Sequence, residues 1–121
     1  MISITKKTLQ DLEFDTILHT ISSKCNTDLG KQKAMEIAPF STKESLMDAL
    51  LQTSEYQSSF SNNNAIPNHG FESITTEIKL LSIEDSFLEV PSFRKIATVS
   101  DTVNTLLVFL KKFQDYYPKI Y

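Results

Sequence analysis

The sequence predicts an all-α protein, a helical bundle of about five helices around one long C-terminal helix. Apolar residues between positions 91 and 117 recur in alternating steps of three and four, the spacing of one side of an α-helix. These residues form an apolar seam: Ile96, Val99, Val103, Leu106, Leu110, Phe113 and Tyr117. The 121 residues also include only two glycines and four prolines, fewer turn residues than a sheet protein of this size needs.

Two prolines bound the long helix. Pro91 suits a first helical position, where its missing N–H is not needed. Pro118 disfavours helical geometry in the residue before it, so we expect the helix to end at Tyr117. Such a helix is roughly 40 Å long. We expect shorter helices to pack against its seam, which Leu107 and Phe109 widen.

The first forty residues predict a turn and two short helices. The turn is expected near Thr8–Leu12, and a helix follows from about residue 13 to 24. Its apolar residues have helical spacing: Phe14, Ile17, Leu18, Ile21 and Cys25. The second helix, 28–36, has Thr27 as its expected N-cap, and Pro39 closes the segment.

Gly30 lies within the first turn of that second helix. A glycine there costs about 1 kcal/mol relative to alanine. The cost indicates a packing reason, and we interpret Gly30 as a point where a neighbouring backbone approaches closely.

The middle of the chain predicts a capped helix followed by a loop. Ser41 and Glu44 form a capping box, Ser-x-x-Glu, in which each side chain satisfies the other residue's backbone N–H. The helix that they open is expected to run to about Phe60. The polar segment Ser61–Gly70 is typical of a long flexible loop.

A shorter helix and a connector then lead to the long helix. Ile74, Ile78 and Leu81 have the spacing of one helix face, with Ser73 as a possible cap. The segment 82–90 has no clear partner strand, so we predict an irregular connector.

Composition excludes several classes of protein. The formal net charge of −3 and a single arginine, Arg94, argue against a free-standing nucleic-acid-binding domain. The one cysteine, Cys25, cannot form an internal disulfide and fits a reducing compartment, where its expected role is that of a small apolar residue. The start MISITKK lacks the apolar core of a signal peptide, and no stretch has the ~20 apolar residues of a membrane span. We therefore expect a cytoplasmic protein with no membrane partner.

A nucleotide-binding phosphate loop is not expected. That loop needs Gly-x-x-x-x-Gly-Lys followed by Ser or Thr. Gly30-Lys31 is the only Gly-Lys pair, Cys25 takes the place of the first glycine, and Gln32 replaces the hydroxyl that would hold magnesium.

Metal-binding and catalytic sets are not expected either. His19 and Cys25 lie about 120° apart around a helix, and His69 lies in the polar loop, so the three do not have metal-ligand spacing. The helical carboxylates are interpreted mostly as a solvated face, with paired acid–base work as a remote second interpretation: Glu36, Glu44, Asp48 and Glu55. The sequence therefore predicts no catalytic, cofactor-binding or metal-ligating residue, and this chain is not expected to be an enzyme.

A loose group of lysines leaves two interpretations open. The group comprises Lys6, Lys7, Lys24, Lys31 and Lys33. Ordinary solvation of a helix junction is the favoured interpretation. The alternative is weak, salt-sensitive contact with phosphate groups.

Short motifs along the chain resemble the amino terminus of the MutS family. They occur in the family's order: Leu9, Leu12-Glu13-Phe14, Ile17-Leu18, Leu29-Gly30-Lys31, Pro39, Ile66-Pro67-Asn68-His69-Gly70-Phe71 and Phe87-Leu88-Glu89-Val90-Pro91. The similarity is closer to the second branch of the family, the MutS-like proteins that lack the mismatch-recognition domain.

The chain length and the 40% hydrophobic content predict a single helical domain over residues 1–121. The resemblance implies that this domain is the N-terminal part of the core or lever region of a longer protein. Such proteins resemble dimeric, ATP-driven clamps that embrace branched or mismatched DNA, in DNA mismatch repair or in the suppression of recombination. The implied partners are the remaining domains of the parent chain and, through the parent, DNA. ATP and magnesium belong to the parent, and no DNA-contact residue is assigned here.

Two functions follow as alternatives. The first is a structural lever that transmits motion between a DNA clamp and an ATPase domain. The second is an independent helical protein–protein interaction module without a DNA function, with a possible homodimer through Leu106, Leu110 and Phe113.

Overall fold

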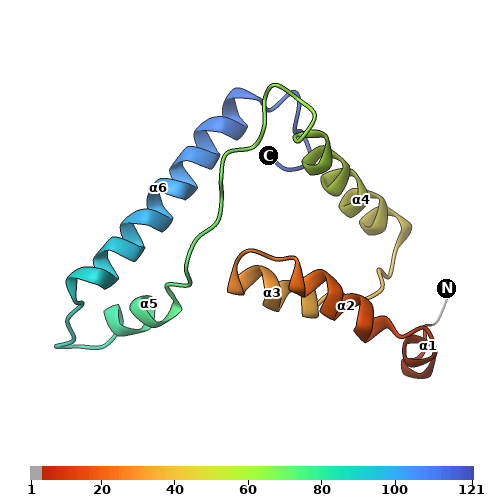
Figure 1. The fold of residues 1–121 in the computed structure, drawn as a ribbon, viewed down its shortest axis with the longest axis horizontal. Helices are drawn as coiled ribbons and strands as arrows, with labels where there is room; N and C mark the ends of the chain where they lie inside the picture. The colour runs from red at the N-terminus through yellow and green to blue at the C-terminus, as the bar shows by residue number, and fades with distance from the viewer. Residues whose placement is uncertain (1–3) are drawn as a thin grey trace. The chain divides into compact units, whose positions relative to one another are not determined.

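The computed structural model describes residues 4–121 and is all-helical over them (Figure 1). These residues form six α-helices and no strand, and the longest helix lies near the C-terminus. The predicted fold class is confirmed. The chain divides into two compact units, Met1–Pro39 and Phe40–Tyr121, which are described separately, and the single domain 1–121 stays a prediction. Part of the segment interpreted as lacking a signal-peptide core, residues 1–3, lies outside the described residues.

The first unit contains helices α1 (Lys6–Asp11), α2 (Phe14–Ser23) and α3 (Asp28–Met35). Helix α2 packs against both of the others. Leu18 of α2 and Ala34 of α3 are buried, as the helical spacing of the apolar residues predicts for Leu18.

Helix α1 replaces the turn expected near Thr8–Leu12, so that prediction was too short. The helix begins earlier because Thr5 caps it, its hydroxyl accepting the backbone N–H of Thr8 at 3.1 Å. Glu13 then adopts a left-handed backbone conformation with φ of 52°. This residue separates α1 from α2.

Helix α3 is capped by Thr27 as predicted, with the Thr27 hydroxyl accepting the backbone N–H of Gly30 at 3.0 Å. The close approach at Gly30 is confirmed, but the neighbours differ from the prediction. A Cβ atom added to Gly30 would lie 2.9 Å from Thr27 Oγ1 and 3.4 Å from Cys25 Cβ. The approaching groups are therefore side chains and not a neighbouring backbone.

The second unit contains helices α4 (Lys43–Ser58), α5 (Thr75–Leu81) and α6 (Val90–Lys112). Both predicted caps are wrong by one residue. Thr42 and not Ser41 caps α4, because the Thr42 hydroxyl accepts the backbone N–H of Ser45 at 3.2 Å.

Helix α5 begins after Ile74, which makes no side-chain capping hydrogen bond. The Ser73 hydroxyl accepts the backbone N–H of Thr75 at the longer distance of 3.4 Å, so Ser73 is not the N-cap residue. The segment between α5 and α6 is irregular, as predicted.

Helix α6 ends earlier than its apolar pattern predicts. The expected end was Tyr117, but the last helical residue is Lys112. The chain turns after Phe113 and brings Tyr117 into a fully buried position. Burial of one large aromatic side chain outweighs the continuation of the helix by a few hydrogen bonds.

The apolar seam of α6 is only partly covered by the rest of the second unit. Its residues are half-buried apart from Val103, which is exposed, and Tyr117. The segment 59–74 between α4 and α5 runs beside α6 (Figure 1) and contributes half-buried apolar residues: Ile66, Pro67, Phe71 and Ile74. An irregular segment, rather than a ring of shorter helices, therefore covers much of this side.

None of the helices in residues 4–121 is long and apolar enough to cross a membrane.

The contacts of Gly30 predict a non-additive pair of substitutions. Gly30→Ala alone should give little or no gain in stability, because its Cβ displaces the capping hydroxyl of Thr27. In a Thr27→Ala background the same change should raise the free energy of unfolding by about 1 kcal/mol, the helix-propensity difference. Urea unfolding followed by circular dichroism measures both values. Equal effects of Gly30→Ala in the two backgrounds would contradict the assigned contact.

Candidate interaction surface on the long helix

The C-terminal turn, residues 113–121, is attached to α4 by the carboxylate of Glu55. One Glu55 oxygen, Oε2, accepts the backbone N–H groups of Lys119 at 2.9 Å and of Ile120 at 3.1 Å. The side chain of Lys119 donates to Asp48 at 2.6 Å. Charge-assisted hydrogen bonds of this kind are stronger than neutral ones. They hold the end of the chain against α4.

Tyr117 joins three parts of the second unit. Its hydroxyl donates to the backbone carbonyl of Asn64 at 2.5 Å, and its ring lies 5.8 Å from that of Phe109, centroid to centroid. The loop after α4, helix α6 and the C-terminal turn therefore meet at one side chain that has no contact with water.

The ion pair on Lys119 changes its titration. The hydrogen bond that Lys119 donates to Asp48 and the attraction of that carboxylate raise the pKa of Lys119 above its ordinary value, and Glu55 adds a smaller effect in the same direction. The lysine is therefore more firmly protonated in the folded protein than in the unfolded chain.

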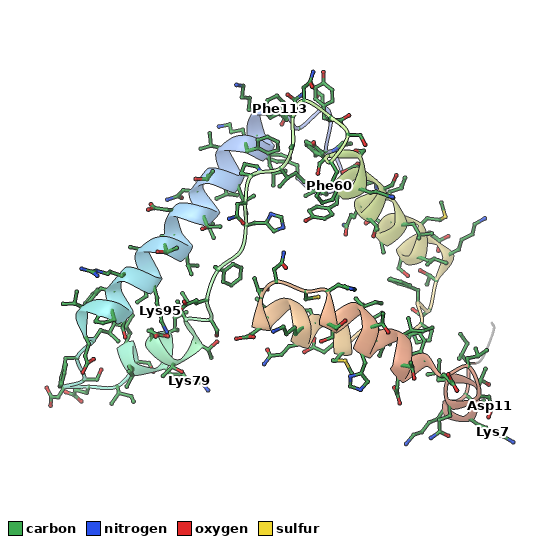
Figure 2. All side chains as sticks on the ribbon, in the orientation of Figure 1. Lys7, Asp11, Phe60, Lys79, Lys95 and Phe113 are labelled. Atoms are coloured by element: carbon green, nitrogen blue, oxygen red, sulfur yellow. The ribbon has the colours of Figure 1, made fainter. Side chains whose placement is uncertain are left out.

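A second attachment lies near the start of α6. The ammonium group of Lys95 lies 3.4 Å from a carboxylate oxygen of Glu72 and 3.6 Å from one of Glu77. Glu77 is buried on α5, and Figure 2 shows Lys95 of α6 lying beside that helix. The ion pairs join α5 and the segment before it to α6.

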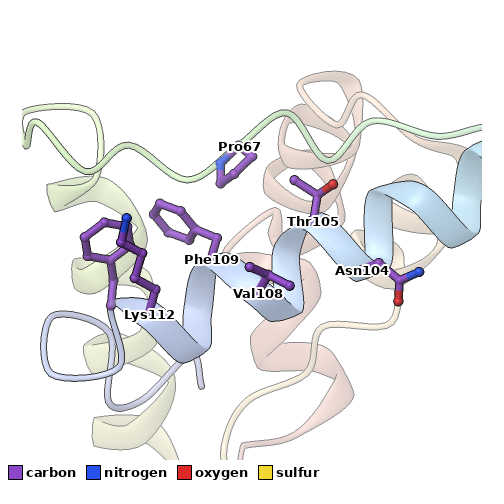
Figure 3. A pocket seen from close by; sticks show the side chains of 7 residues that line it. Pro67, Asn104, Thr105, Val108, Phe109 and Lys112 are labelled. Atoms are coloured by element: carbon purple, nitrogen blue, oxygen red, sulfur yellow. The ribbon is translucent and has the colours of Figure 1, made fainter.

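A groove lies on α6 between these two attachments (Figure 3). It is open to solvent, has a volume of about 490 Å³ and is lined by Pro67, Asn104, Thr105, Val108, Phe109, Lys112 and Phe113. Figure 3 shows the ring of Phe109 directed toward Pro67. The floor is thus apolar, while one end carries an amide and a hydroxyl and the other end carries an ammonium group.

The cation of the groove, the ammonium group of Lys112, lies over an aromatic ring. The nitrogen of Lys112 lies 5.2 Å from the ring centroid of Phe113, a cation–π contact. Lys112 forms no salt bridge with any residue that the structure describes. The groove therefore combines an apolar floor with a positive charge available to an anionic group.

The predicted dimer residues and the exposed residues of α6 are different sets. Leu106, Leu110 and Phe113 are half-buried within their own chain. Val108 in the groove and Leu107 on another side of the helix are exposed. The sequence pattern could not distinguish these sets, because all of these residues are apolar and lie on the same helix.

His69 is held inside the loop by both ring nitrogens. Nδ1 lies 2.9 Å from the carbonyl oxygen of Pro67 and donates to it, while Nε2 lies 3.1 Å from the hydroxyl of Tyr56, with which it forms a second hydrogen bond. His69 thus fixes the loop to α4.

The residues considered from the sequence as metal ligands do not form a ligand cluster in the described part of the chain. The Cys25 thiol donates to the backbone carbonyl of Ile21 at 3.4 Å. Within residues 4–121 no group of three or more His, Cys, Asp or Glu side chains could hold a metal ion.

The group of lysines is partly neutralised within its own helix. Lys31 pairs with Asp28 at 3.5 Å, and Lys33 pairs with Glu36 at 2.6 Å. Contact of the group with phosphate stays a prediction.

The sequence did not predict the most important carboxylate of the second unit. The expectation of a solvated face is wrong for Glu55, which binds the turn 64 residues later. No local pattern signals such a contact, because it depends on where the chain folds back.

The chain is similar to the Endonuclease MutS2 of Alkaliphilus oremlandii (strain OhILAs), with 27% identity over 119 residues. Those residues are 97% of this chain and 15% of the relative, so the chain spans only a small part of that protein's length. No family model and no solved structure matches the chain. The similarity suggests a relationship to the MutS family and does not extend to a branch of it.

Two substitutions test the attachment of the C-terminal turn. Tyr117→Phe removes the hydroxyl bond to Asn64 and should lower the free energy of unfolding by about 1 kcal/mol. Tyr117→Ala also empties the buried site and should cost about 3–5 kcal/mol. Urea unfolding measures both, with Tyr116→Phe on the exposed neighbouring residue as the control. A loss from Tyr116→Phe as large as that from Tyr117→Phe would contradict the assigned role.

The raised pKa of Lys119 predicts a loss of stability at alkaline pH. The contribution of the protonated Lys119 to the free energy of unfolding is complete below the ordinary lysine pKa. It disappears as pH rises through the higher pKa that Lys119 has in the folded protein. Asp48→Asn should remove this contribution. The free energy of unfolding of the unchanged chain and of Asp48→Asn is measured from about pH 9 to 12. The two values should differ most at the lowest pH and become equal at the highest. A difference in stability that does not change with pH would contradict the pairing of Lys119 with Asp48. Ionisation of tyrosines in this pH range affects both proteins alike.

Proposed function

We propose that the chain is the N-terminal part of the helical core, or lever, region of a MutS-like DNA-binding ATPase, of the branch without a mismatch-recognition domain. Its role in this proposal is structural and motion-transmitting. The observation that supports it most is the similarity to a MutS2 protein over 97% of the chain. The proposal places the parent in DNA mismatch repair or in the suppression of recombination.

The attachments of α6 suit a lever. The helix has 23 residues, which at ~1.5 Å per residue makes it roughly 35 Å long. Lys95 ties its first part to α5, and Tyr117 ties the turn after its last residue to the loop that follows α4. A rigid element fixed at both ends transmits a displacement along its length with little loss.

The proposal assigns the chemistry to other parts of a longer protein. ATP, magnesium and the DNA contacts would belong to those parts, in a cytoplasmic protein, and this chain would not be an enzyme. The Gly30-Lys31 pair supports this division, because the hydroxyl that a phosphate loop supplies to magnesium is a glutamine here, Gln32.

The first test uses this chain alone. Calorimetric titration of the chain with magnesium ATP up to about 1 mM should give no binding. Titration with a four-way DNA junction at low salt should give none either, because the proposal assigns the DNA contacts to other parts of the protein. Micromolar nucleotide binding by these 121 residues would contradict the assignment of the ATPase chemistry to other domains.

The second test measures coupling in the longer protein that carries this segment. Lys95→Ala should lower the stimulation of ATP hydrolysis by branched DNA about 2- to 10-fold, because it releases α6 from α5, while hydrolysis without DNA stays unchanged. Lys79→Ala is the matched control, since Lys79 also lies near this junction, on α5. Unchanged stimulation in Lys95→Ala would contradict the lever role.

The second candidate function is an independent helical protein–protein interaction module without a DNA function. The exposed apolar side chains of α6 favour it, among them Phe93 and Leu107. The coupling experiment separates the two functions, because a module of this kind predicts no effect of Lys95→Ala on ATP hydrolysis.

A further inference from the structure

We propose that the groove on α6 binds a second copy of this chain, and that its occupant is the connector between α5 and α6. Two copies would pair with their α6 helices antiparallel, so that each connector enters the other copy's groove. The inference depends on the groove, the connector and the charges of α6, and is independent of the proposed function.

The connector carries the most exposed large apolar side chain among the described residues. Phe87 is 80% exposed. The turn before it is fixed by backbone hydrogen bonds from Ile83 to Leu80 and from Ser86 to Ile83, and by the Ser86 hydroxyl, which donates to the Leu80 carbonyl. An ordered segment that holds an aromatic ring in water loses little conformational entropy on binding and buries a large apolar area.

The groove and the connector have complementary chemistry. The groove offers an apolar floor, including Phe109 and Pro67, and an ammonium group on Lys112. The connector offers the ring of Phe87 with carboxylates close to it in sequence, Glu84 and Glu89 among them. An aromatic anchor in an apolar pocket beside opposite charges is the usual pattern of an energetically dominant contact.

The connector cannot fill the groove of its own molecule. It precedes the first residue of α6, Val90, while the groove centres on Val108. At ~1.5 Å per residue these positions lie roughly 27 Å apart along a rigid helix. In an antiparallel pair the start of one α6 meets the end of the other, so the same distance brings each connector to the partner's groove.

The face of α6 that carries the groove is self-complementary in charge. Arg94 and Asp101 are seven residues apart and so lie on one side of the helix, and Arg94 forms no salt bridge with the described part of the chain. In a two-fold pair, residue i meets residue j and j meets i. Arg94 of each copy would then face Asp101 of the other, with the small side chain of Ala97 near the axis.

The same geometry favours the antiparallel orientation over the parallel one. A parallel pair would bring Lys111 and Lys112 of the two copies together, and like charges across an interface are repulsive. The antiparallel pair instead places these two lysines beside the acidic residues Glu84 and Asp85 of the connector.

Sedimentation equilibrium of the 121-residue chain tests the proposal directly. The chain should sediment at twice its monomer mass of 13.8 kDa at about 100 μM and dissociate on dilution. Phe87→Glu should raise the dissociation constant at least about 100-fold, because it removes two anchors from each dimer. A monomer at the highest concentration would overturn the proposal.

A charge exchange tests the two-fold arrangement without touching the groove. Arg94→Asp and Asp101→Arg, each alone, place like charges in contact and should weaken the dimer about tenfold or more. The double variant restores opposite charges and should return to within about threefold of the unchanged chain. Failure of the double variant to recover would overturn the antiparallel pairing.

Leu107→Glu is the matched control, because Leu107 is exposed on α6 but lies outside the groove lining. It should leave the dissociation constant unchanged. A dimer that is lost in Leu107→Glu and kept in Phe87→Glu would overturn the proposal and assign the contact to the other side of α6. Circular dichroism should show the same helix content for every variant, as expected for substitutions at exposed positions.

Discussion

The second unit depends on the burial of Tyr117. Its ring is removed from water, and its hydroxyl reaches the carbonyl of Asn64, 53 residues earlier. To place this side chain, the chain leaves the helix after Lys112 and turns back toward α4. The turn then brings the backbone N–H groups of Lys119 and Ile120 to the carboxylate of Glu55. Loop, helix and C-terminal turn are thereby joined at one point, and α6 acquires a fixed end.

The surfaces left open on α6 follow from how it is covered. An irregular segment lies along one side, and ion pairs hold the first part of the helix to α5. This covering leaves most of the apolar seam half-buried and Val103 exposed, and other apolar residues of the helix remain in water. Val108 of α6 and Phe87 of the connector before it are both exposed.

The two proposals use different parts of the same helix. A lever needs the attachments at the ends of α6, at Lys95 and Tyr117. A contact between copies needs the groove and the connector, which those attachments leave open. The two roles are compatible, since a fixed helix presents its exposed face in a constant position and so loses little entropy on binding. The similarity to a MutS2 protein bears on the first role, and the arrangement of charge on α6 bears on the second.

The sequence by itself determined the helices, because their signals are local: the apolar spacing of α2 and α6, the cap at Thr27 and the scarcity of glycine and proline. It located the close approach at Gly30, although not the groups that cause it. Only the tertiary structure decided where α6 ends, which carboxylate holds the C-terminal turn, and which apolar residues of the long helix remain in water. The first two outcomes depend on contacts between residues more than fifty positions apart, and the third depends on the segment before α5 that covers α6. No spacing within a helix encodes these contacts.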